Sequence, residues 1–393
     1  MIAFLDFFFH CILPNLQKIY PMKTKLFSWL FAFVLCGSCA QNDTSIQTPT
    51  NINYNLELIV PELDIPWGLA MLPDKTLLIT EKSGSIIHFK EGTKHEVSKV
   101  PETYLRGQGG LMGIAIHPDF ASNKRVYFTQ SSSVDSDEEG GNTALFSAIL
   151  SDDELTDVKL LHKAQPNTRV GRHFGSRIVF DNEGYLYFSV GDRGRRDDNP
   201  QNLTRDGGKV YRLHDDGTIP SDNPFVKTDG AVKAVFSYGH RNPQGMVLHP
   251  ETGAIWTHEH GPLGGDEINI IRAGANYGWP KITYGKNYSG TTITKDTALP
   301  GMEQPLYYWI PSIAPSGMAF VSGEVYPEWE GSLLVGSLKF KYLERLIIED
   351  NKVVYREKVA EDIGRVRDVI MGVDGYIYIA IENKGIYKIV PKT

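Results

Sequence analysis

The amino-acid sequence predicts an all-β fold, a six-bladed β-propeller whose blades are four-stranded antiparallel sheets. The composition includes 38 glycines and 19 tyrosines in 393 residues, which favours turns and strands over helices. One strand-turn-strand pattern recurs six times along the chain, and long apolar patterns with helical spacing are hard to find. All-β domains run long as single units, so one domain is compatible with this length.

Each copy of the pattern has a starting anchor, a few alternating apolar positions, and a turn before the next strand. The anchors are Gly68, Gly113, Ser176, Gly245, Gly317 and Arg367. The first and last intervals are close to the ~40–50 residues of a four-stranded blade, and the three between them are longer. The excess predicts insertions at 131–142, 191–206 and 261–300, which we expect to build a central, loop-lined site.

Several segments have the composition of short strands. The segments 184–190 and 375–381 are rich in β-branched and aromatic residues. The segment 54–60 has no partner within the first blade's own run. We expect it to pair with 385–390 and close the ring.

Composition also limits the partners. The net charge is -7 and the pI is about 5.9, so a nucleic-acid partner is not expected. The only cysteines are Cys11, Cys36 and Cys39, all upstream of the predicted propeller. The folded part is therefore expected to lack disulfides and thiol ligands.

The N-terminal region has the features of an export signal. Basic residues from Met22 to Lys25 precede the apolar run 26–35, as in a secretory signal. A permanent transmembrane helix is the alternative, although the run is too short to span a bilayer. Whether residues 1–21 belong to the protein, or the chain starts at Met22, stays open.

The end of this region resembles the lipobox of bacterial lipoproteins, because Gly37 and Ser38 precede Cys39. We expect residues 1–40 to be a signal region that is removed or lipidated near Cys39, 41–53 to be a polar tether, and 54–393 to be the propeller. Cleavage after Ala40 without a lipid is the alternative. In both cases the protein is expected to be exported, either to the periplasm or as an outer-membrane or cell-surface lipoprotein.

Two loop segments concentrate groups that bind ligands. SYGHRNPQG at 237–245 combines a cation, an amide and glycines, with a structural turn as the alternative. HEHGPLGGDEIN at 258–269 holds two histidines, three acids and a Gly-Pro turn, which suits Ca²⁺ because this ion accepts main-chain oxygens. Zinc held by His258 and His260 is the rival, although no third nitrogen or sulfur ligand is near in sequence.

Four cations from three blades are candidates for a ligand site near the axis. Arg365 and Arg367 are two residues apart and face the same side, and Lys339 and Arg241 lie at the entrances of other blades. Together they predict a multiply anionic ligand, a polycarboxylate or polyphosphate. A solvated, salt-bridged edge is the alternative.

His173 lies just before the third anchor and so at the predicted central mouth. Imidazole is the natural base near neutral pH. A structural or merely exposed histidine is the alternative.

Four motifs in order, RGQGGLMGIAIHPDF at 106–120, GHRNPQG at 239–245, GP…DEIN at 261–269 and GANYGWP at 274–280, carry a family resemblance. From residue 66 to 391 the chain resembles the soluble glucose and aldose sugar dehydrogenases that depend on pyrroloquinoline quinone (PQQ). The resemblance implies an enzyme that oxidises the anomeric carbon of an aldose to a lactone by hydride transfer to PQQ. The electrons would pass to an external acceptor, a quinone or a cytochrome.

The resemblance also implies roles for individual residues. His173 would be the catalytic base. Gln108, Arg241 and Asn242 would meet the quinone oxygens. The remaining cofactor contacts would come from the cations Lys339, Arg365 and Arg367.

Metal and substrate contacts follow from the same resemblance. Main-chain oxygens of Gly261 and Pro262 would hold the Ca²⁺ that bridges to PQQ. The Glu267 side chain and the Tyr277 carbonyl would hold a second Ca²⁺. Trp309 would stack on the sugar ring, with a core aromatic of blade five as the alternative.

One residue departs from the family pattern. Arg172 precedes the base, where relatives have an acid or an amide. Its charge would favour a neutral imidazole, unless the two side chains point opposite ways as strand neighbours do. The long insertions typical of strict glucose oxidisers are reduced in this chain. The resemblance therefore implies a broad aldose specificity.

Two other functions compete with this interpretation. A non-catalytic exported propeller could bind glycans or protein partners, since a fold does not imply a function. A metal-dependent lactonase or esterase would need several acidic ligands on the axis, where this sequence offers cations.

Overall fold

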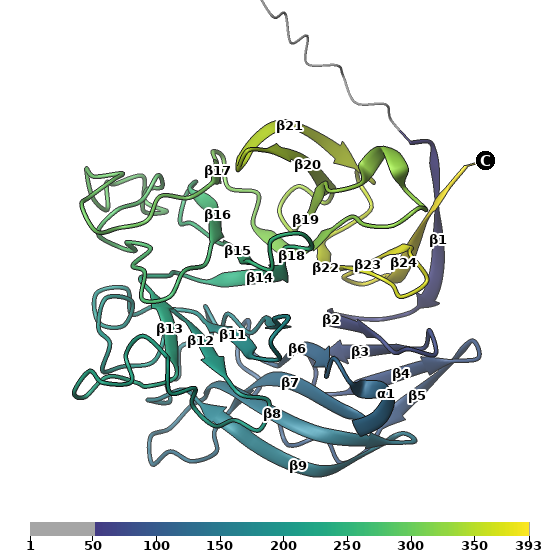
Figure 1. Ribbon diagram of the computed structural model, residues 1–393, viewed down its shortest axis with the longest axis horizontal. Coiled ribbons are helices and arrows are strands. Elements are labelled where there is room, and N and C mark those ends of the chain that lie inside the picture. The colour runs from purple at the N-terminus through teal and green to yellow at the C-terminus, as the bar shows by residue number, and fades with distance from the viewer. Residues whose placement is uncertain (1–51, 393) are drawn as a thin grey trace, which may run out of the picture. The chain divides into compact units, whose positions relative to one another are not determined.

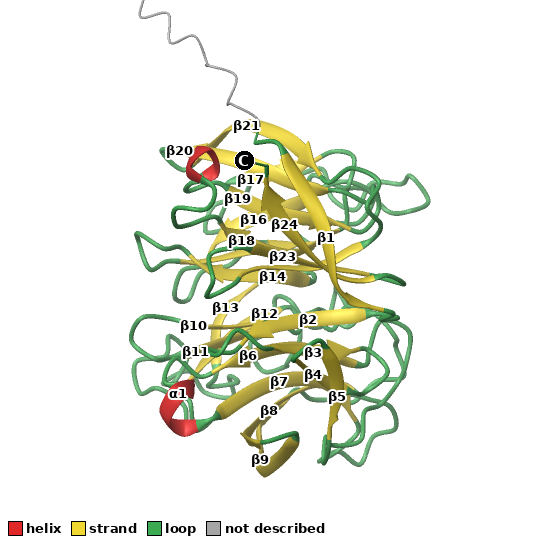
Figure 2. Ribbon diagram, turned by 90° about the vertical axis from the view of Figure 1, so that its right-hand side faces the viewer, coloured by secondary structure: helices red, strands yellow, loops and turns green. Residues whose placement is uncertain are grey.

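The computed structural model describes residues 52–392, which form six four-stranded antiparallel sheets. Besides strands, this part of the chain has one helical turn, α1 (Phe120–Asn123), and one 3-10 turn, η1 (Pro327–Trp329) (Figure 2). The predicted all-β, six-bladed propeller is confirmed. The predicted signal region and the tether up to residue 51 lie outside the described residues. No helix within 52–392 is long and apolar enough to cross a membrane.

The first three blades each consist of four consecutive strands. Blade one contains β2 (Pro66–Met71), β3 (Leu77–Glu81), β4 (Ile86–Lys90) and β5 (Thr93–Val97). Blade two contains β6 (Leu111–Ile116), β7 (Arg125–Ser132), β8 (Asn142–Ser151) and β9 (Glu154–Lys163). Blade three contains β10 (Ile178–Phe180), β11 (Leu186–Val190), β12 (Lys209–Leu213) and β13 (Val235–Tyr238).

The last three blades include the closure of the ring. Blade four contains β14 (Pro243–Leu248), β15 (Ile255–Glu259), β16 (Asp266–Ile270) and β17 (Tyr307–Trp309). Blade five contains β18 (Pro315–Phe320), β19 (Leu333–Ser337), β20 (Leu343–Glu349) and β21 (Lys352–Val359). Blade six contains β22 (Val366–Met371), β23 (Ile377–Ile381), β24 (Gly385–Pro391) and, as its outer strand, β1 (Tyr54–Pro61).

The predicted closure of the ring is confirmed. β1 pairs antiparallel with β24, with Leu56 opposite Ile389. The N-terminal strand thereby completes the last sheet and joins the two ends of the domain. Without it, β24 would present an unpaired edge to solvent.

The six predicted anchors all fall in or beside the first strand of a blade. These first strands contact one another around the ring, β2 with β6 and β22, and β18 with β14 and β22. Figure 1 shows them gathered at the centre, with outer strands such as β9 and β21 at the rim. The loops that enter these strands therefore meet near the axis.

Buried polar side chains link three blades near the centre of the ring. The Arg177 guanidinium of blade three lies 2.7 Å from the Asp368 carboxylate of blade six. The second Asp368 interaction is with blade one, where the N–H of Leu69 donates to the carboxylate at 2.9 Å. Asp368 therefore links blades one, three and six near the centre of the ring.

Candidate active site

Two adjoining cavities lie at the centre of the propeller. The first, about 600 Å³, is lined by residues of all six blades, from Trp67 to Arg367, and we call it the axial cavity. The second, about 490 Å³, contains His173, and we call it the His173 cavity. Pro262 and Tyr288 line both, so the two cavities meet there. The predicted insertions 191–206 and 261–300 contribute to their walls.

The third predicted insertion, 131–142, lines neither cavity. The backbone N–H of its Gly141 donates to the carbonyl of Thr168 at 3.0 Å. Nδ2 of Asn167 donates to the carbonyl of Ser133 at 3.2 Å. The prediction that this insertion builds the site directly is wrong, because it packs instead on the segment that leads to His173.

Asp192 orients the predicted base. Its Oδ1 lies 2.6 Å from Nδ1 of His173, and the exposed fractions of the two side chains are 12% for His173 and 1% for Asp192. Because the carboxylate holds the proton on Nδ1, Nε2 of the neutral ring is left as an acceptor. The pair therefore has the arrangement of a general base fixed by a buried carboxylate.

The electrostatics suit this role. Burial lowers the pKa of His173, and the nearby Arg241 and Arg172 cations act in the same direction, although the hydrogen bond to Asp192 opposes them. The imidazole is therefore neutral near neutral pH. Burial opposes ionisation of Asp192, but hydrogen bonds from His173 and Trp279 hold its pKa below the ordinary value. The carboxylate is therefore ionised.

The position of Arg172 relative to the base, left open by the sequence, follows from the backbone. His173 has a φ of 57°, so it is not extended and the alternation of strand neighbours does not apply. Arg172 and His173 consequently line the same cavity.

Polar side chains hold the backbone around the base. Oε1 of Gln108 accepts from the N–H of His173 at 2.8 Å. Arg193, fully buried, donates to the carbonyls of Val170, at 2.6 Å, and of Arg172. The loop that carries the base is therefore fixed before any ligand binds.

Trp279 and Gly194 also donate hydrogen bonds to Asp192. Nε1 of Trp279 donates to Oδ2 of Asp192 at 2.8 Å, and the N–H of Gly194 donates to Oδ1 at 2.6 Å. The sequence predictions placed neither Asp192 nor Trp279 in the site. The available signals were the position of Asp192 in the insertion 191–206 and that of Trp279 in the GANYGWP motif.

The predicted cations Lys339, Arg365 and Arg367 line the axial cavity, together with Lys82. Glu382, which was not predicted, lies between the two arginines, with its oxygens 2.6 Å from Nε of Arg365 and 2.9 Å from Nε of Arg367. Arg367 is 13% exposed and Arg365 44%. One carboxylate faces four cations, so the cavity keeps an excess of positive charge.

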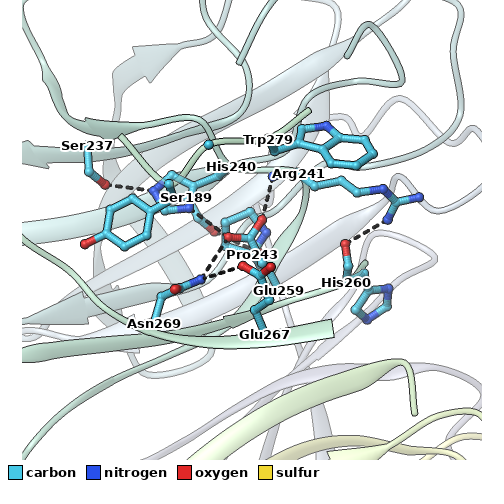
Figure 3. A network of polar contacts seen from close by, with 12 residues as sticks. Ser189, Ser237, His240, Arg241, Pro243, Glu259, His260, Glu267, Asn269 and Trp279 are labelled. Carbon is cyan, nitrogen blue, oxygen red and sulfur yellow. Dashed lines mark hydrogen bonds and ion pairs between the residues drawn. The ribbon is translucent and has the colours of Figure 1, made fainter. Parts of the chain in front are cut away.

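Arg241 lies in the His173 cavity, apart from the other three predicted cations. Its backbone N–H donates to Oε2 of Glu259 at 2.5 Å, and its Nη1 donates to the carbonyl of His260 at 2.8 Å (Figure 3). The predicted convergence of four cations in one place therefore holds for three of them.

Asn242 is fully buried beside the base loop. Its Oδ1 accepts from the N–H of Gly175 at 3.0 Å. Its Nδ2 is a buried donor without a hydrogen-bond partner among residues 52–392. An unpaired buried donor is costly in a protein alone and is satisfied when a ligand supplies the acceptor.

Main-chain oxygens crowd together at the Gly261–Pro262 turn. The N–H of Gly261 donates to Oδ1 of Asp266 at 2.8 Å, which fixes the turn. A Cβ at Gly261 would collide with the carbonyl oxygens of Gly264 and Gly265, so glycine is required there. Such a cluster of carbonyls suits a hard cation.

The zinc alternative is wrong. Nε2 of His258 lies 3.4 Å from the carbonyl of Gly317, and Nε2 of His260 lies 2.6 Å from that of Pro315. Burial lowers the pKa of His258 to about 3 and that of His260 well below its usual value, so both are neutral donors to these carbonyls. In the described part of the chain, no three His, Cys, Asp or Glu side chains form a group that could hold a metal ion.

Two acidic side chains meet at a smaller cavity that Tyr277 also lines. Nδ2 of Asn269 lies 3.3 Å from the carboxylates of both Glu259 and Glu267 (Figure 3). Burial and, next, the charge of Glu259 raise the pKa of Glu267 to about 8. Glu267 therefore keeps its proton near neutral pH unless a cation binds beside the pair. Glu259 was outside the predicted ligand set, although it lies in the same motif.

Trp309 is not near either cavity. It is 1% exposed, its Nε1 donates to Oε2 of Glu344 at 2.7 Å, and it packs with Phe320 and Leu333 of blade five. No face of its ring is open to a sugar. The substrate prediction for Trp309 is therefore corrected to a core position between blades four and five.

These features agree with the class that the motifs implied, an oxidoreductase of the sugar dehydrogenase type built on a propeller. The chain belongs to the Glucose / Sorbosone dehydrogenase family, whose model matches residues 63–388. The predicted family, the soluble PQQ-dependent glucose and aldose sugar dehydrogenases, is thereby confirmed.

The chain is similar to named proteins and to solved structures. The chain is 42% identical to the aldose sugar dehydrogenase YliI of Escherichia coli (strain K12), covering 84% of this chain and 90% of the relative. It is 29% identical to quinoprotein glucose dehydrogenase B of Acinetobacter calcoaceticus, covering 85% and 86%. The structure of the PQQ-bound aldose sugar dehydrogenase from Streptomyces coelicolor is similar, with a TM-score of 0.71, 26% identity, and coverage of 88% of this chain and all of that one.

Proposed function

We propose that the protein oxidises the anomeric carbon of aldose sugars to lactones, with PQQ as hydride acceptor, and passes the electrons to an external quinone or cytochrome. The observation that carries this proposal is His173, oriented by Asp192, beside an axial cavity lined by cations. The PQQ-bound relative and the quinoprotein relative support the choice of cofactor.

The axial cavity fits PQQ, a planar tricarboxylate. Trp67, Met112 and Phe174 form an apolar cluster in its wall, which suits a flat ring. The excess of cations there suits the carboxylates, and a guanidinium binds such groups through paired hydrogen bonds. Gln108 lines the same cavity, and the unpaired Nδ2 of Asn242 would donate to a quinone oxygen.

Two Ca²⁺ ions fit the remaining groups. The carbonyls of Gly261 and Pro262 would hold one, with Pro262 in the wall of both large cavities and Gly261 in the wall of the smaller one. The Glu267 carboxylate and the Tyr277 carbonyl would hold the second, and its charge would offset the repulsion between Glu267 and Glu259. When bound, PQQ with Ca²⁺ supplies a Lewis-acid-activated acceptor for the hydride that leaves C1.

The protein's own residues accept the proton of the sugar. Nε2 of His173 accepts the proton of the C1 hydroxyl, and the ionised Asp192 stabilises the imidazolium that forms. The Arg241 guanidinium in the same cavity favours the negative charge that develops on the C1 oxygen. The fixed base loop means that little reorganisation accompanies the transfer.

Export is part of the proposal and rests on the sequence. We propose that the apolar run 26–35 directs secretion and that Cys39 carries a lipid anchor. The tether 41–53 would then separate the propeller from the membrane surface.

The test is reconstitution of the purified protein with PQQ and Ca²⁺, followed by dye reduction with a panel of aldoses. We expect oxidation that a strong chelator abolishes. His173→Gln should lower turnover by ~10²–10⁴ while PQQ still binds. Oxidation without PQQ, or full turnover in the variant, would contradict the proposal.

A further inference from the structure

Arg172 is one of the cations in the wall of the His173 cavity to which the proposed reaction gives no contact with the sugar. Its side chain is exposed and lines the cavity wall. The neighbouring Arg195 in the same wall has a carboxylate partner, Asp198, at 2.9 Å. Among residues 52–392, Arg172 has no carboxylate within ion-pair distance. It is therefore an uncompensated guanidinium beside the base.

The position of Arg172 is built into the structure. Arg193 donates a hydrogen bond to the backbone carbonyl of Arg172. Its guanidinium lies against Gly194, where a Cβ would be only 2.5 Å from Nε of Arg172. Gly194 has a φ of 68° and donates its N–H to Asp192. The cation thus rests on the same loop that orients the base.

The geometry of a pyranose ring indicates which substituent of the sugar Arg172 would meet. In a hexopyranose, C1 and C5 flank the ring oxygen, so the C6 group lies on the same edge of the ring as the C1 hydroxyl. With that hydroxyl at Nε2 of His173, the C6 group would share the cavity with Arg172. A guanidinium gains most when the facing group is an anion with several acceptor oxygens.

We propose that Arg172 selects aldoses that carry an anionic group at C6, either a carboxylate or a phosphate. The inference rests on the proposed function and names its substrate class. The reaction at C1 is the same for every sugar, so Arg172 is expected to set the relative preference among them.

The first test compares kcat/KM for glucuronate and glucose 6-phosphate with kcat/KM for glucose in the reconstituted protein. We expect at least one anionic sugar to exceed glucose about tenfold, and which one does so distinguishes carboxylate from phosphate. Arg172→Gln should abolish the preference. The matched control Arg272→Gln removes the same charge from an exposed residue paired with Glu303 outside both cavities, and should keep it. No preference in the wild type, or a preference that survives Arg172→Gln, overturns the inference.

The second test measures binding of the same three sugars by calorimetry, without turnover. The anionic sugars should bind about tenfold more tightly to the wild type than to Arg172→Gln, and less so at high salt because exposed charges are screened. If anionic sugars bind through Arg172 but no aldose is oxidised, the proposed function is contradicted and the inference about Arg172 is not. Oxidation of glucose with no effect of Arg172 in either test would sink this inference alone.

Discussion

Nε1 of Trp279 donates a hydrogen bond to Oδ2 of Asp192 at 2.8 Å, although the two residues are 87 positions apart. The contact joins the insertion of blade four to the loop of blade three that holds His173. The 5.4 Å separation between the Arg241 guanidinium and the Trp279 ring brings a third group into the same unit. The orientation of the base therefore depends on packing between two blades.

Trp279→Phe tests this dependence, because it keeps an aromatic ring and removes only the donor. We expect kcat to fall about three- to tenfold, since the Asp192 carboxylate loses one of its fixed donors, and PQQ affinity to stay unchanged. Steady-state kinetics and a PQQ titration measure the two quantities. An unchanged kcat would contradict a positioning role for Trp279.

Trp309→Phe is the matched control and also tests the corrected position of Trp309. It leaves Glu344 without its indole donor in the core. We expect the free energy of unfolding to fall by about 1–3 kcal/mol and the KM for sugar to stay unchanged. A raised KM with unchanged stability would restore the substrate role.

Asp192→Asn should change the pH dependence of kcat. Activity requires neutral His173, and burial lowers its pKa, so the wild-type rate should persist below pH ~6.5 and fall only at lower pH. Asp192 raises the pKa of His173, so its removal should move the acid limb further down while the plateau drops ~10²–10⁴. A limb that moves to higher pH would contradict the assignment.

Arg367 and Arg365 should differ in their contribution to PQQ binding. Arg367→Gln removes the more buried cation, and we expect the larger loss of affinity, ~10²-fold or more. Arg365→Gln should lose less, because its exposed charge is screened by solvent. Titration of PQQ into both variants measures the affinities, and equal losses would show that burial does not set them.

Glu267 should make stability depend on pH when Ca²⁺ is absent. Its pKa in the folded chain, about 8, is above the ordinary 4.5, so the folded state holds the proton that the unfolded state releases. The melting temperature should therefore fall as pH rises from about 5 to 8, and Ca²⁺ should stabilise more at pH 8 than at pH 5. Glu267→Gln should weaken the pH dependence of the melting temperature and that of the stabilisation by Ca²⁺. The same substitution at Glu251, an exposed residue, should leave both unchanged. Calorimetry with and without Ca²⁺ provides the comparison.

Cys39→Ala tests the lipid anchor. We expect the protein to leave the membrane fraction, because the thiol that would carry the lipid is gone. Fractionation of cells that express either form measures the change. A wild-type protein that is already free of the membrane would favour cleavage after Ala40.

Strands and their order could be predicted because both depend on local sequence. Alternating apolar residues and Gly or Pro turns encode a strand within a few residues, so the anchors from Gly68 to Arg367 fell in or beside the innermost strands. The ring closure by 54–60 is a long-range pairing, and it could be predicted because that segment lacked a local partner.

The sequence by itself also determined which residue types the site has, since His173 and Lys339 lie in loops, and Arg367 at the start of an innermost strand, that a propeller must bring to its axis. Only the tertiary structure decided their partners. Trp279 on Asp192 and Trp309 in the core are contacts between blades, and Glu382 meets the two arginines across neighbouring strands of blade six. No periodicity along one strand encodes these contacts. Whether a side chain is buried between blades or faces a cavity depends on the angle at which separate sheets pack, and that angle exists only in the assembled ring.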